Sequence, residues 1–215
     1  MCINREVSVA AYFVATATCM HLWCRNNLND RWIAVTLGYI ATMQLLEFLM
    51  HHDKACGDLN RNATEVAFWQ NLLQPAVFIM TALAITGGLP WYAWLSTIAY
   101  LLYVIPMMLR ARKHLGPFPC TTTCPGQSTG LRFPYTDVPG SKEILTWTLF
   151  ALALALPFGA MPRNGGWYIA GVLGTYTLAL ILGRVRQCGD TPATGSWWCL
   201  FGLIVPLMAV KINAA

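Results

Sequence analysis

Long apolar segments with almost no charge run through this chain, and they limit its fold more than any other feature. A helix needs about 20 mostly apolar residues to cross the hydrocarbon core of a bilayer. Candidate segments lie at roughly 7–24, 32–50, 66–86, 89–109, 144–161, 166–183 and 196–210. They are continuous apolar runs and lack the alternation of a membrane β-barrel strand. The sequence therefore predicts an all-α, polytopic transmembrane helix bundle of about seven helices.

The composition also indicates that lipid is the main solvent of this chain. Charged residues make up 11% of it, whereas a soluble domain carries about 25%. The sequence contains no basic domain or groove-sized element that would hold a nucleic acid. We therefore expect a single integral membrane domain over residues 1–215, with the lipid bilayer as its partner and with no nucleic-acid partner.

The first apolar segment has a second interpretation. It resembles the apolar region of a secretory signal peptide, and Ala15-Thr16-Ala17 imitates a small-residue cleavage site. However, Arg5 is balanced by Glu6, so the preceding residues lack the net positive side-chain charge of such a signal. If residues 1–17 were removed, six helices would remain.

The tryptophans mark the predicted ends of the segments. Amphipathic rings of this kind settle at the headgroup level of a bilayer. All nine lie within a turn or so of a segment end: Trp23, Trp32, Trp69, Trp91, Trp94, Trp147, Trp167, Trp197 and Trp198. We expect them to form the aromatic belts of the bundle.

The basic residues predict an orientation. Ten of the fourteen Lys and Arg residues fall on the side of the N-terminus, and four fall on the other side. Because cytoplasmic loops carry an excess of Lys and Arg, we expect the N-terminus in the cytoplasm and the C-terminus outside. Arg110, Arg112 and Lys113 directly follow the fourth segment, and anionic lipid headgroups are expected near them. The glycosylation pattern Asn62-Ala63-Thr64 would then face the cytoplasm unmodified, and a glycan there would invert the orientation.

One connection is much longer than the others. Residues 110–143 are rich in Pro, Gly and Thr and show no helical period. Long loops of this kind are either functional or disordered. We predict a long cytoplasmic loop between the fourth and fifth helices and expect it to be disordered.

The cysteines are predicted to stay reduced. Five of the eight lie on the predicted cytoplasmic side: Cys2, Cys56, Cys120, Cys124 and Cys188. Thiols in that compartment do not form lasting disulfides, so no disulfide framework is expected. Those nearest the membrane, Cys2, Cys56 and Cys188, are candidates for palmitoylation.

Polar side chains inside the apolar segments are the main candidates for a site, because they are costly to place in lipid. Of the nine acids, Glu47 alone falls inside a predicted span. Gln44 precedes it by three residues and His51 follows it by four, so the three share one helical face. Asn71 and Gln74 lie at a similar depth in the next segment. The sequence predicts one intramembrane polar cluster made of Glu47, Gln44, His51, Asn71 and Gln74.

Three functions are consistent with this cluster. The first is a small transporter or channel-like protein whose Glu47 binds a proton or a cation, with the amides as partners. The second is a structural or membrane-organising protein in which the cluster only fixes helix packing. The third is a membrane-embedded enzyme that uses Glu47 and His51.

We place the transport function first and favour a protein that is not an enzyme. No further His or Cys is placed to complete a tetrahedral metal site around Glu47 and His51. We therefore expect no catalytic residue, no metal and no cofactor, and we leave a homo-oligomer open. A retinal protein is disfavoured, because Lys211 lies at the very end of the last segment and not at its centre.

Three short motifs resemble those of a known family. They are Met43-Gln44-Leu45-Leu46-Glu47-Phe48, Leu73-Gln74-Pro75 and Gly195-Ser196-Trp197-Trp198-Cys199. The family consists of small polytopic membrane proteins of large DNA viruses and algae, to which no activity is assigned. The resemblance implies a multi-pass membrane protein of viral or algal type and transfers no catalytic residue.

Overall fold

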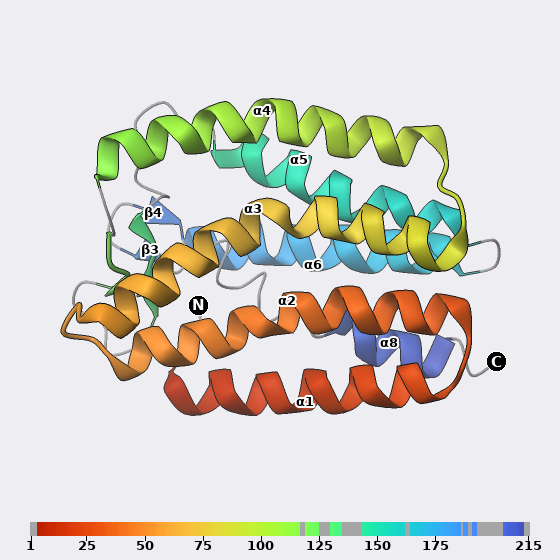
Figure 1. The fold of residues 1–215 in the computed structure, drawn as a ribbon, viewed down its shortest axis with the longest axis horizontal. Helices are drawn as coiled ribbons and strands as arrows, with labels where there is room; N and C mark the ends of the chain where they lie inside the picture. The colour runs from red at the N-terminus through yellow and green to blue at the C-terminus, as the bar shows by residue number, and fades with distance from the viewer. Residues whose placement is uncertain are drawn as a thin grey trace.

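The computed structural model of the chain is predominantly helical (Figure 1). It describes residues 4–116, 119–124, 130–134, 143–161, 164–185, 187–188, 191–192 and 204–212. The α-helices there are α1 (Arg5–Cys24), α2 (Leu28–His52), α3 (Asp58–Thr86), α4 (Trp91–Leu115), α5 (Glu143–Ala155), α6 (Gly165–Val185) and α8 (Ile204–Ile212). The 3-10 helix η2 (Leu156–Ala160) continues α5, and the strands are β1 (Thr122–Thr123), β2 (Leu131–Arg132), β3 (Gln187–Cys188) and β4 (Thr191–Pro192). The predicted all-α class is confirmed.

Capping residues set the ends of the first helices. Asn4 is the N-cap of α1, and its Oδ1 accepts a hydrogen bond from the amide of Val7 at 2.8 Å. Asn27 caps α2 in the same way, accepting from the amide of Asn29 at 2.9 Å. Helix α3 ends at Thr86, and its C-cap Gly87 has a φ of +78°, a left-handed conformation that favours glycine. Short turns therefore join α1 to α2, α2 to α3 and α3 to α4.

Five of these helices are long and apolar enough to cross a membrane: α1, α2, α3, α4 and α6. The 20 residues of α1 correspond to about 30 Å of helix, which matches the hydrocarbon core of a bilayer. In Figure 1 the long helices lie lengthwise beside one another and form a bundle. Their length and composition agree with a multi-pass membrane protein.

The prediction of about seven spans is only partly met. The apolar helix over residues 144–160 falls below the length of the other five, and its last turn is the 3-10 helix that contains Pro157. Pro157 has no amide hydrogen to donate, which explains the change from α-helix to a tighter turn. Of the predicted segment 196–210, only residues 204–210 lie within the described part, where they form most of α8.

Helix α1 is packed as part of the bundle. Its buried residues recur at helical spacing and form the face turned inward: Ser8, Ala11, Ala15, Cys19 and Leu22. This face packs along α2. The packing favours a retained first span over a signal peptide removed after residue 17.

The outward faces of the helices are apolar. Helices α1, α4 and α6 expose large hydrophobic side chains, among them Phe13, Met20, Leu95, Leu102 and Ile181. A soluble monomer rarely exposes apolar surface on this scale. These faces are suited to contact lipid chains.

Trp32 does not belong to an aromatic belt, contrary to the sequence prediction. Its side chain is fully buried, and its indole Nε1 donates to the carbonyl oxygen of Phe78 at 3.2 Å. Its ring packs against Phe78 and Phe158, and Phe158 stacks on Tyr168. This aromatic core joins α2, α3, η2 and α6. In contrast, Trp23, Trp69, Trp91 and Trp167 are exposed, as a belt requires, and Trp197 and Trp198 lie outside the described residues.

The predicted disordered loop is folded where the structure describes it. Helix α4 continues to Leu115, so the loop begins later than residue 110. Strands β1 and β2 then pair antiparallel, and Leu131 and Phe133 are buried in a cluster with Met43 of α2 and Ala67 of α3. In Figure 1 the strands lie at the same end of the bundle as the α2–α3 turn. We call the assembly of residues 53–64, 119–124 and 130–134 the cap.

Candidate functional site

Helix α2 carries the acidic part of the predicted cluster into the interior of the bundle. Glu47 is 0% exposed, Gln44 1% and His51 4%. The spacing of three and four residues places them on one helical face, one turn apart. His51 also interacts electrostatically with Glu6 in the first turn of α1. A column of polar side chains therefore runs along α2 from near the cap toward the membrane interior.

Helix α3 places the amide-bearing residues of the cluster beside this column. Gln74 is buried and Asn71 is half-buried, and the Nε2 of Gln74 donates to the Oδ1 of Asn71 at 3.0 Å. Helices α2 and α3 pack together along their lengths. The cluster thus lies on two neighbouring helices, as the sequence indicated, and its role stays a prediction.

Gln70 supplies a direct link between the two helices near the cluster. Its Nε2 donates to the carbonyl oxygen of Tyr39 and to the hydroxyl of Thr42, both at 2.8 Å. The Tyr39 hydroxyl in turn donates to the carbonyl oxygen of Gln70 at 3.4 Å. This contact was not predicted from the sequence, because the α2 partners of Gln70 contribute a backbone oxygen and a hydroxyl oxygen.

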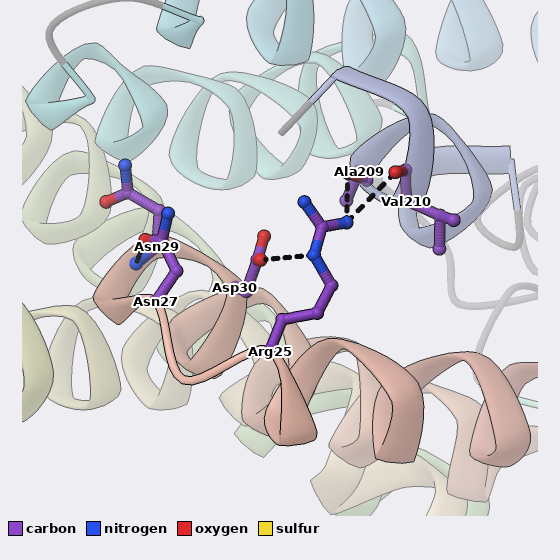
Figure 2. Close-up of polar contacts among 6 residues, drawn as sticks. All are labelled: Arg25, Asn27, Asn29, Asp30, Ala209 and Val210. Atoms are coloured by element: carbon purple, nitrogen blue, oxygen red, sulfur yellow. Dashed lines mark hydrogen bonds and ion pairs between the residues drawn. The ribbon is translucent and has the colours of Figure 1, made fainter. Parts of the chain in front are cut away.

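A second buried acid lies at the opposite end of the bundle, and sequence reasoning missed it. Asp30, in the first turn of α2, is fully buried, and its Oδ2 lies 3.1 Å from the Nε of Arg25. Figure 2 shows Arg25 reaching from the α1–α2 turn past Asp30 to α8. There its Nη1 donates to the carbonyl oxygen of Val210 at 2.9 Å.

The Arg25 guanidinium therefore connects three helices. The carbonyl of Val210 belongs to the last turn of α8, where backbone oxygens lack a helical donor and carry partial negative charge. A cation between these oxygens and the Asp30 carboxylate neutralises both. The signal in the sequence was Asn27 followed three residues later by Asp30, which is a helix N-terminus pattern with an acid in the first turn.

Asn60 organises the cap. Its Nδ2 donates to the carbonyl oxygens of Asp53 and Thr121, both at 2.9 Å, and its Oδ1 accepts from the amide of Thr121 at 3.0 Å. The hydroxyl of Thr64 donates to the Thr121 hydroxyl at 2.8 Å. Asn60, Thr64 and Thr121 are all buried. These contacts attach the segment after α4 to the start of α3.

A disulfide links the same two segments, which corrects the prediction of reduced thiols. Cys56 in the α2–α3 turn is bonded to Cys120, across 64 residues of sequence. Cys124 is also disulfide-bonded. The prediction was wrong because it depended on the compartment that was assigned from the Lys and Arg count. Palmitoylation of Cys56 is excluded in this state, and Cys2 lies outside the described residues.

One residue of the predicted headgroup site has partners within the protein, and headgroup contact stays a prediction. Arg112 forms an ion pair with Glu65 of α3 and lies 5.8 Å from the centre of the Trp69 ring. Trp69 also donates to Glu65 at 2.8 Å. Arg110 and Lys113 are exposed, and they remain the candidates for headgroup contact.

The described residues contain no group of three or more His, Cys, Asp or Glu that could hold a metal ion. A cavity of about 30 Å³ lies between α2, α3, α5, η2, α6 and α8, and apolar side chains and Thr175 line it. A cavity of this volume is large enough to admit a water molecule. The predicted cluster does not line this cavity.

Comparison with known proteins adds no assignment: no family model, no curated protein and no solved structure matches the chain. The resemblance to small membrane proteins of large DNA viruses and algae stays a prediction.

Proposed function

We propose that this protein is a small transporter or channel-like membrane protein in which Glu47 takes up and releases a proton. The observation that carries the proposal is the complete burial of Glu47 on a helix long enough to cross a bilayer. Ionisable residues inside membrane spans are costly, and they commonly mark proton relays or ion pathways. Burying a carboxyl in a membrane span costs free energy, so we expect Glu47 to have a function that compensates for this cost.

The neighbours of Glu47 on α2 support a proton path. From His51 to Gln44 the column extends about 10 Å along the helix axis. Of the three side chains, His51 lies nearest to the cap. A proton that enters from the cap end would meet His51 first and Glu47 one turn deeper.

The composition of the site favours a proton over a metal cation. Hard divalent cations take six or more oxygen ligands, usually from several carboxylates. The predicted cluster contains one carboxylate. The described residues hold no group of three or more His, Cys, Asp or Glu side chains that could bind a metal ion. A proton needs one carboxyl and a neighbour that accepts or donates a hydrogen bond.

A structural function is the second candidate, and the packing of the cluster favours it. Gln44, Glu47 and His51 are closed off from solvent, and Gln70 bonds directly to α2. Polar bonds between membrane helices stabilise their association by about 0.6–2 kcal/mol each. On this account Glu47→Leu would lower the melting temperature of the bundle and change no flux.

Proton flux into liposomes separates the two candidates. Reconstituted wild-type protein is expected to acidify the lumen of liposomes under an imposed pH gradient and potential, and Glu47→Gln is expected to abolish this flux. Gln keeps the size and hydrogen-bonding capacity of the side chain but cannot ionise. Asp58→Asn is the matched control, because Asp58 is an exposed acid in the first turn of α3.

The outcomes are distinct. Loss of flux in Glu47→Gln with wild-type flux in Asp58→Asn supports the transport function. Flux that is equal in wild type and Glu47→Gln, in folded samples, contradicts it and leaves the structural function.

The orientation of the bundle is not fixed by this function. The Lys and Arg count places the N-terminus in the cytoplasm, whereas the disulfide in the cap requires an oxidising environment at the same end.

A further inference from the structure

The two cysteines of the cap are brought together by contacts that do not depend on their bond. Thr121, next to Cys120, is held by Asn60 and Thr64. Gly57, next to Cys56, donates its amide to the Asp53 carboxylate at 3.1 Å. The Cα atoms of Cys56 and Cys120 are 5.6 Å apart, within the usual range for a disulfide. The fold therefore presents the two thiols to each other wherever the chain is folded.

The backbone at Cys56 has a conformation that is uncommon for a cysteine. Its φ is +59°, in the left-handed region. Residues other than glycine, asparagine and aspartate are uncommon in that region, because Cβ approaches the following carbonyl. The left-handed conformation raises the free energy of a cysteine above that of a glycine at this position. The disulfide bond to Cys120 compensates for this difference.

The chemistry of the bond limits the compartment. Its formation removes one proton and one electron from each thiol, and the electron pair passes to an oxidant, such as an oxidoreductase whose own disulfide becomes two thiols. Oxidants of this class act outside the cytoplasm, in the periplasm or the lumen of the secretory pathway, whereas cytoplasmic thiol pools reverse the reaction. Two segments of the cap, through Cys56–Cys120 and Cys124, carry oxidised cysteines.

We propose that the cap faces a non-cytoplasmic, oxidising compartment, and that the α1–α2 turn faces the cytoplasm. Both α2 and α3 are long enough to span a membrane, so the α1–α2 turn and the cap lie on opposite sides. The start of α1 lies at the cap end (Figure 1), which places the N-terminal end of α1 outside. The orientation is the reverse of that expected from the charge count.

The charge count does oppose this orientation. The α1–α2 turn and the start of α2 hold Arg25 and Arg31, whereas the cap side holds more basic residues. Those on the cap side include Arg5, Lys54, Arg61, Arg110, Arg112, Lys113 and Arg132. The positive-inside rule describes a bias of insertion, which other features of a chain can override. Cytoplasmic thiols would reduce a disulfide, so the Cys56–Cys120 bond constrains the compartment more strongly than the distribution of basic residues does.

Cys24 provides a built-in probe for the opposite end. It is an exposed, free cysteine at the last residue of α1. The test uses intact cells that express the full wild-type chain and a membrane-impermeant maleimide. Peptide mapping by mass spectrometry reads the labelling of Cys24 and the oxidation state of Cys56 and Cys120 separately. No substitution is needed, so folding is not at risk, and no transport is measured, so the proposed function is tested independently.

We expect Cys24 to stay unlabelled in intact cells and to be labelled fully after permeabilisation. Cys56 and Cys120 should be recovered as a disulfide, and an impermeant phosphine reductant added to intact cells should make them reactive to the maleimide. Labelling of Cys24 in intact cells would overturn the proposal. Recovery of Cys56 and Cys120 as free thiols, after thiols are trapped at lysis, would overturn it as well.

Discussion

Replacing Arg25 with methionine is expected to lower the free energy of unfolding by about 3–5 kcal/mol, because the change leaves a buried carboxylate without its cation. Asp30 is 0% exposed and lies against the Arg25 side chain, which is 20% exposed. Methionine keeps an unbranched apolar stem and loses the guanidinium, with its charge and its hydrogen bond to α8. Denaturant or thermal unfolding in detergent measures the loss, and protease sensitivity near residues 204–212 reports the release of α8.

Two further variants give this prediction its controls. Arg31→Met removes a neighbouring arginine whose contact is a cation–π approach to Trp23 at 5.2 Å, and it should cost about 1 kcal/mol or less. The double variant Arg25→Met, Asp30→Leu removes both charges and should recover most of the loss. A stability of Arg25→Met that matches that of Arg31→Met would show that Asp30 does not depend on Arg25.

The second large effect is expected from the cap disulfide. Replacing Cys56 and Cys120 together with alanine should destabilise the folded protein by about 2–4 kcal/mol, because the bond restricts the unfolded chain over a long loop. The bond joins residues separated by 64 positions, and α3 and α4 lie between them. The unfolding transition in detergent, with and without reductant, measures the effect.

Cys24 is the control residue for this experiment as well. Cys24→Ala removes an exposed free thiol and should change stability by less than about 0.5 kcal/mol. Reductant should lower the stability of wild type and of Cys24→Ala alike, and should lower that of the double alanine variant less, because the disulfide of Cys124 is still present in it. If reductant has no effect on wild type, the disulfide makes no contribution to the fold.

The helices of this protein are largely readable from its sequence. Apolar length alone locates α1, α2, α3, α4 and α6, because a membrane span must satisfy its own backbone and therefore forms a helix. The prediction failed where a local feature changed the helix, as at Pro157. It also failed for the segment after α4, whose prolines and glycines suggested disorder. Buried residues such as Leu131 attach that segment to α2 and α3.

The site was readable only where its residues are close in sequence. The helical spacing of Gln44, Glu47 and His51 placed them on one face of α2, and the structure buries all three. Asp30 was missed because its neutralising contacts involve the far end of the chain, at Val210. Trp32 was assigned to the membrane interface by its position near a segment end, but its partners on other helices draw it into the core.

The prediction for the cysteines depended on the prediction for the orientation. The count of Lys and Arg residues predicted that these cysteines face the cytoplasm. Because cytoplasmic thiols stay reduced, that prediction excluded the Cys56–Cys120 bond. The pairing itself depends on contacts of Asn60 with Thr121, which are 61 residues apart. No local pattern in the sequence predicts such a contact.

Infrared difference spectroscopy of the protein in lipid tests most directly whether Glu47 exchanges a proton within the bundle. A pH step should change the carbonyl band of a protonated carboxyl in wild type, because a buried acid and its conjugate base absorb differently. This change should be absent in Glu47→Gln and retained in Asp58→Asn. Difference spectra of wild type and Glu47→Gln that coincide across the pH range would contradict the claim.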